Sequence, residues 1–191
     1  MNRLKQQYNE QVAKTLQTEL KLKSIMAVPA VQKIVINMGV IDPQDPKARE
    51  NVMANIIEQF RSITGQQPQI TRARKAIAGF KLRKGDPLGV MVTLRGEKMW
   101  QFMDKLISIT LPRVKDFQGV SRTAFDAKGN YNLGIEEQIV FPEINYDTIE
   151  RIRGLQVTVV MNNSNPDSSR RLLELLGMPF EKPSDKQEKA A

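Results

Sequence analysis

The stretch VQKIVINMGV, residues 31–40, alternates between side chains suited to a buried face and side chains suited to an open one. Successive side chains of a strand point to opposite faces, so this alternation predicts a half-buried strand that ends at Gly39. The stretch GVMVTLRG, residues 89–96, repeats the pattern. The predicted buried rows are Ile34, Ile36, Met38, Val90, Val92 and Leu94, and the open rows are Lys33, Val35, Asn37, Met91, Thr93 and Arg95.

The remaining segments alternate irregularly between helical and strand-like patterns. Asp45 and Asn165, each followed by proline, predict helix N-caps, and Gly65 and Gly177 predict helix ends. The pattern favours an α+β fold: an antiparallel or mixed sheet with helices packed mainly on one face, in a single domain over residues 1–180. Helices are predicted at 3–22, 46–64, 99–109, 146–153 and 166–176, strands at 69–71, 138–144 and 155–162, and a disordered tail at 181–191.

The amino-acid composition limits the classes of function that the chain can have. The chain has 29 Lys and Arg against 21 Asp and Glu, a formal net charge of +8, which indicates a polyanionic partner. It has no Cys and no His, which removes the usual ligands of zinc, haem and iron–sulfur centres and both common nucleophile pairs. We expect no cofactor, no metal and no catalysis. No signal peptide or membrane span is predicted, so a cytoplasmic location is expected.

A basic segment without acids lies between the strands at 69–71 and 88–95. Phe80 interrupts its charges, and two hypotheses for this ring remain open: stacking on a nucleotide base, or packing beneath its own loop. Phosphates are the partner that such an unmixed basic segment suits. Its cations are Arg72, Arg74, Lys75, Lys81, Arg83 and Lys84.

An acidic block without Lys or Arg covers residues 129–150. It predicts either a solvated face or a surface that avoids RNA and meets a basic protein. Neighbouring residues of a strand point to opposite faces, so Glu136 and Glu137 make a poor catalytic pair. Glycine-rich phosphate-binding motifs are absent from the chain. The block contains Glu136, Glu137, Glu143, Asp147 and Glu150.

Several long strings resemble one known family, in order and at the expected spacing over about residues 3–182. They include KIVINMG, GQQPQITRARKAIAGFKLRKG, VTLRGEKMWQFMDKLI, LPRVKDF, FDAKGNYNLGIEEQIVFPEINYD, RIRGLQVTVV and LLGMPF. The chain is similar in these strings to the 5S-rRNA-binding ribosomal protein five of the bacterial large subunit. The resemblance implies a structural protein of the central protuberance, next to large-subunit rRNA and neighbouring proteins.

The resemblance also implies three sets of contact residues. The set for 5S rRNA is Asn37, Gly39, Gln66, Gln67, Thr93 and Arg95. The set for the elbow of the P-site tRNA is Arg74, Lys75, Phe80, Lys81, Arg83 and Lys84. The set for an intersubunit bridge to a head protein of the small subunit lies around 112–119 and 134–142 and comprises Arg113, Lys115, Glu136 and Glu137.

The chain departs from the family pattern at Ala30, Gln118 and Glu136, where a basic residue is common. The alternative hypothesis is a free RNA-binding regulator or chaperone on a similar α+β face. A Mg²⁺-dependent enzyme on phosphorylated substrates is a third hypothesis, but it would need clustered acids beside the basic segment, which the sequence keeps apart.

Overall fold

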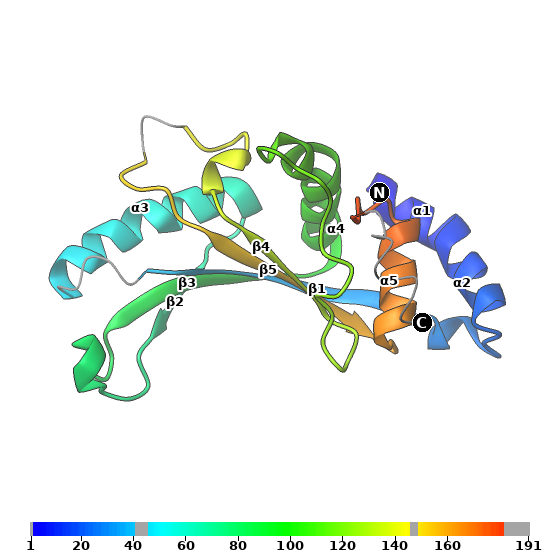
Figure 1. Ribbon diagram of the computed structural model, residues 1–191, viewed down its shortest axis with the longest axis horizontal. Coiled ribbons are helices and arrows are strands. Elements are labelled where there is room, and N and C mark those ends of the chain that lie inside the picture. Colours follow the sequence, from blue (N-terminus) through cyan, green and yellow to red (C-terminus); the bar gives the residue numbers. More distant parts are fainter. Residues whose placement is uncertain (1, 41–45, 146–148, 182–191) are drawn as a thin grey trace.

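A five-stranded antiparallel sheet runs through the computed structural model, which describes residues 2–40, 46–145 and 149–181 (Figure 1). The strand order is β2-β3-β1-β5-β4, so the longest strand lies at the centre with a long hydrophobic strand on each side. Every strand pair in the described chain is antiparallel. The strands are β1 (Ala30–Gly39), β2 (Gln69–Arg72), β3 (Pro87–Leu94), β4 (Tyr131–Ile135) and β5 (Leu155–Asn162).

The long helices pack against one face of this sheet. In Figure 1, α3 (Pro46–Thr64) and α4 (Gly96–Lys105) lie on the same side of the strands, and no long helix covers the opposite side. This arrangement confirms the predicted α+β fold. The helices are α1 (Arg3–Gln7), η1 (Tyr8–Val12) and α2 (Ala13–Glu19) in one continuous run, α3 (Pro46–Thr64), α4 (Gly96–Lys105) continued by η4 (Leu106–Thr110) and η5 (Leu111–Arg113), and α5 (Pro166–Leu175); short 3₁₀ turns are η2 (Ile25–Ala27), η3 (Ala78–Phe80) and η6 (Gln138–Val140).

Local signals explain where the helices begin and end. Asn165 caps α5 in a reciprocal box with Ser168, whose hydroxyl accepts from the Asn165 amide at 2.8 Å. Gly65 and Gly177 follow α3 and α5 with φ of +63° and +89°, a conformation that costs glycine little. The helix α3 begins at Pro46 as predicted. Its predicted cap, Asp45, lies outside the described residues, as does the tail from residue 182.

The hydrophobic core lies between the helices and the covered face of the sheet. The buried rows of β1 and β3 follow the predicted alternation and meet α3 and α4. Trp100 is only 7% exposed, which confirms that it belongs to the core. Large side chains that fill this layer are Ile34, Ile36, Met38, Val90, Val92, Leu94, Ile56, Phe60, Phe102, Met103 and Leu106.

Two predicted elements were wrong. Residues 138–144 form no strand, because Gln138 is buried and its amide Nε2 donates to the Arg151 carbonyl at 2.9 Å. Its Oε1 accepts from the backbone amide of Arg153, so the backbone of 151–153 bonds to Gln138 and does not coil into the predicted helix. The edge strand beside β5 is β4, whose Asn132 and Gly134 lower its strand propensity. Residues 146–148 of the predicted helix lie outside the described residues.

Candidate nucleic-acid interface

The open face of the sheet carries the polar rows of its strands. Because the register is antiparallel and regular here, side chains from four strands line up across this face in two rows. Three of the predicted RNA contacts, Asn37, Gly39 and Thr93, therefore lie on one continuous surface. The first row contains Met91, Asn37, Gln156 and Gly134, and the second contains Thr93, Val35, Thr158 and Asn132.

Asn37 lies near the centre of this face. Its side chain is half-buried, and it forms no hydrogen bond with any residue that the structure describes. Because no described protein group occupies this amide, both its oxygen and its nitrogen are available to hydrogen-bond a ligand that covers the face. Its neighbours Gln156, Thr158 and Asn132 were missed as candidates, although the alternation of residues 155–162 already pointed the first two to the open face.

Gln66 and Gln67 are held by the protein itself. The Nε2 of Gln66 donates to the Thr93 carbonyl at 3.1 Å, which ties the start of β2 to the end of β3. The Oε1 of Gln67 accepts from the Arg61 guanidinium at 3.0 and 2.5 Å. One end of each amide is thus occupied, and both side chains border the sheet rather than lie at its centre. Arg95 is exposed directly after β3.

The basic segment forms a hairpin arm, defined here as residues 73–86, that extends from the ends of β2 and β3 (Figure 1). Two backbone bonds close its base, from the Ala73 amide to Asp86 and from the Gly85 amide to Ala73, at 2.8 and 2.9 Å. A bridge between Ile77 and Leu82 orders its outer part. The segment is therefore a hydrogen-bonded arm.

The arm presents its cations and its aromatic ring to solvent. Phe80 is 72% exposed, so the hypothesis that it packs beneath its own loop was wrong. Nearby Ile77 is also exposed. Within the described part of the chain, none of the arm's cationic side chains forms an ion pair. These cations are Arg74, Lys75, Lys81, Arg83 and Lys84.

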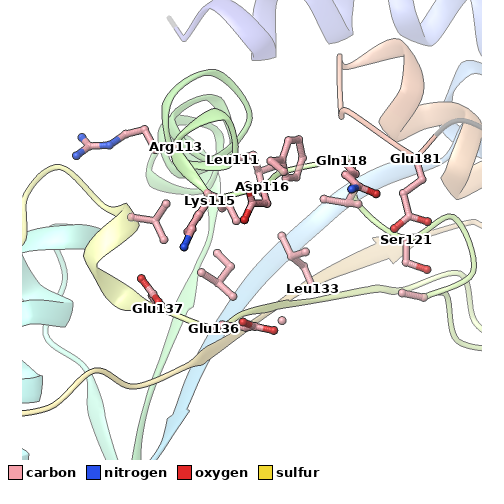
Figure 2. A pocket seen from close by; sticks show the side chains of 18 of the residues that line it. Leu111, Arg113, Lys115, Asp116, Gln118, Ser121, Leu133, Glu136, Glu137 and Glu181 are labelled. Atoms are coloured by element: carbon pink, nitrogen blue, oxygen red, sulfur yellow. The ribbon is translucent and has the colours of Figure 1, made fainter.

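A separate cleft of about 850 Å³ lies between the loop that follows α4 and the edge strand β4 (Figure 2). All four residues predicted for the bridge line it. Lys115 and Glu137 both point into the cleft, whereas the Arg113 guanidinium extends away from it, and Glu136 lies at the sheet edge (Figure 2). The cleft thus brings the two charge signs of this region together at one place.

The acidic block does not form one continuous acidic surface. Glu143 is paired with Lys105 at 2.6 Å, and Glu150 accepts from the Asn55 amide at 2.6 Å. Asp147 lies outside the described residues. At the other end of the cleft, burial raises the pKa of the Tyr131 phenol, with a further contribution from Glu181. This phenol stays protonated and donates to the Ser121 carbonyl at 2.8 Å.

Neither a metal site nor a membrane span is found in the described ranges, residues 2–40, 46–145 and 149–181. No group of three or more His, Cys, Asp or Glu side chains gathers there as a metal site would require. No helix in those ranges combines the length and apolarity that crossing a bilayer needs. The fold is that of an α+β protein, and its open polar sheet face beside a cationic arm is an arrangement that suits RNA binding.

Comparison with known proteins then gives the family. Residues 24–83 match the model described as "Ribosomal protein L5", and residues 87–180 match the model of the C-terminus of the same family. The chain is 50% identical over 183 residues to "Large ribosomal subunit protein uL5" of Oceanobacillus iheyensis, an alignment that covers 95% of this chain and all of that relative. The chain belongs to the ribosomal protein L5 family, which confirms the resemblance seen in the sequence. It is a structural, non-enzymatic protein of the large ribosomal subunit.

Proposed function

We propose that this protein binds 5S rRNA with the open face of its sheet, in the central protuberance of the large subunit of cytoplasmic ribosomes. One observation carries the proposal. The covered face of the sheet is packed with aliphatic side chains, whereas the open face presents the central amide of Asn37, which has no protein partner in the described chain. Amide and hydroxyl side chains suit ribose hydroxyls and base edges. Their position on rigid strands fixes the geometry that selective binding requires.

The arm serves a second RNA. Its cations lie beyond the sheet and have no acidic partners among the described residues, so they are available to phosphates. The ordered backbone holds Phe80 away from the protein body, where it stacks on an exposed base or ribose. The proposed partner of the arm is the elbow of the P-site tRNA.

The cleft beside β4 supplies the third contact. Lys115 and Glu137 point into it with opposite charges, which favours a protein partner over a polyanion, and Glu136 lies at the sheet edge between this cleft and the open face. The proposed partner is a head protein of the small subunit, joined across the intersubunit bridge. Large-subunit rRNA and the neighbouring proteins of the central protuberance complete the proposed surroundings.

The test uses the full chain and two assays. Filter binding compares 5S rRNA with an unrelated RNA of equal length at physiological salt, and sedimentation asks whether the protein stays with large subunits. Selective binding of 5S rRNA together with stable co-sedimentation supports the proposal. Equal binding of both RNAs, with the protein released from subunits, would favour the free RNA-binding regulator instead.

A further inference from the structure

A hollow of about 420 Å³ lies in the open face, beside Asn37. Glycines form its floor, so no side chains fill it. Gly134 is paired with Gln156. Two residues further along, the same register places Gly39, Gly154 and Glu136 side by side. Nothing lies within 4 Å of the position that a Cβ would take on Gly39 or Gly134. Gly39 and Gly134 therefore leave open space, whereas a Cβ on Gly154 would meet the backbone carbonyl oxygen of Ile135 at 3.1 Å.

The hollow is shallow, and the polar groups that line it face solvent rather than other protein groups. The amide of Asn37 has no hydrogen-bond partner in the described chain, and neither does the carboxylate of Glu136. The amide of Gln156 has one weak contact, to Asn132 at 3.5 Å. Convergent polar groups without partners around a preformed hollow are typical of a ligand site.

The charge of the hollow selects against phosphate. No Lys or Arg of the described chain lines it, and Glu136 adds a negative charge at its rim. A phosphate there would meet repulsion with no compensating cation. A neutral ligand with hydrogen-bond donors fits instead, because a carboxylate only accepts hydrogen bonds and takes two in parallel.

We propose that this hollow receives one unpaired guanine base of the bound RNA. This inference rests on the proposed function of the open face and specifies what that face recognises. The Watson–Crick edge of guanine presents two adjacent donors, N1–H and N2–H, which match the two oxygens of Glu136, and its O6 accepts from the amide of Asn37 or Gln156. The other bases lack this pair of adjacent donors beside an acceptor.

The test is chemical probing of 5S rRNA with kethoxal, which adds to N1 and N2 of unpaired guanines. The full-length wild-type protein should protect one unpaired guanine. Gly134→Val fills the hollow with a side chain that suits an edge strand, and it should abolish this protection and weaken 5S rRNA binding about tenfold. Gly79→Val is the matched control: it makes the same change on the arm, where a Cβ also has free space, and it should keep both.

A second pair of substitutions tests the role of Glu136 directly. Inosine lacks the N2 amino group, so placing inosine at the protected guanine should weaken binding by the wild-type protein about fivefold to tenfold. In Glu136→Gln, which keeps the shape and removes the charge, the same inosine substitution should cost clearly less. Thermal unfolding of each variant confirms that it is folded before its binding is compared.

The outcomes separate this inference from the function on which it rests. If 5S rRNA binds selectively but no guanine is protected and Gly134→Val binds normally, the guanine assignment is overturned and the proposed function stands. Protection of a ribose or another base at the hollow would overturn it as well. If the wild-type protein does not distinguish 5S rRNA from an unrelated RNA, the proposed function fails and the guanine assignment fails with it.

Discussion

The two faces of β1 differ in what they contact although their side chains alternate along one strand. Ile34, Ile36 and Met38 are buried beneath the helices, and each is at most 2% exposed. Val35 and Asn37, between them, lie half-buried on the face that no helix covers in Figure 1. The comparison teaches that one strand serves stability through one row and recognition through the other, so changes in neighbouring residues should have separable effects.

The largest expected effect follows from truncating the covered row. Ile36→Ala removes buried methyl groups from the centre of the core, and the free energy of unfolding should fall by about 2–5 kcal/mol. Denaturant unfolding measures this loss. The neighbouring Asn37→Ala is the control and should change stability by less than about 0.5 kcal/mol, as surface substitutions usually do. Similar losses in the two variants would show that the open row is also structural.

The next effect concerns binding by the open row. Asn37→Ala removes a half-buried amide that hydrogen-bonds to the RNA in the proposed interface. The free energy of binding to 5S rRNA should therefore weaken by about 1–3 kcal/mol. Filter binding measures the change. Retention of P-site tRNA should stay unchanged, because Asn37 is on the sheet and not on the arm. An unaltered 5S affinity would place the RNA elsewhere on the protein.

The arm should show the opposite pattern. Replacing Lys81, Arg83 and Lys84 together with Ala removes three exposed cations, so P-site tRNA retention should weaken. The slope of log affinity for tRNA against log salt concentration should also become less steep, by about two units or less. Binding to 5S rRNA is the internal control and should be spared. A large loss of 5S affinity in this variant would refute the separation between arm and sheet face.

The smallest effect lies in the turn before β4, which positions that edge strand. Asp126 accepts from the Asn130 side chain at 2.7 Å and from the amides of Asn130 and Lys128, and these bonds lower the pKa of its carboxyl. The pKa of Asp126 is lower in the folded state than in the unfolded chain, so the ionised carboxylate adds stability at pH values above its unfolded-state pKa. That stability is lost as the pH falls through the lower pKa of the folded state.

Thermal unfolding at neutral pH and near pH 3 tests this turn. Asp126→Ala should melt slightly below the wild type at neutral pH, and the difference should shrink in acid as the wild-type carboxyl takes up a proton. A difference that stays constant across this range would mean that the charge of Asp126 contributes nothing.

Much of the fold could be predicted because its strongest patterns are local. The alternation in β1, β3 and β5 and the caps of α5 depend on neighbouring residues, and each agrees with the structure. The edge strand β4 could not be predicted from its own residues. It is defined by pairing with β5, and the segment after it is held by the buried Gln138, a contact between residues far apart in the sequence.

The candidate site divides in the same way. The cations of the arm could be predicted, since an unmixed charge run is visible in the sequence. The exposure of Phe80 and the order of the arm depend on hydrogen bonds across the hairpin, which composition does not encode. The hollow could not be foreseen, because it needs the register of three strands to bring Gly39, Gly134 and Gly154 together.

The most direct test of this account is the salt dependence of binding to 5S rRNA and to an unrelated RNA of equal length. The account predicts that binding to 5S rRNA stays tight at salt concentrations that release the control RNA, because uncharged contacts on the sheet face add to phosphate attraction. If both affinities fall together with the same steep slope, binding is phosphate attraction alone, and the assignment of the open face to 5S rRNA is contradicted.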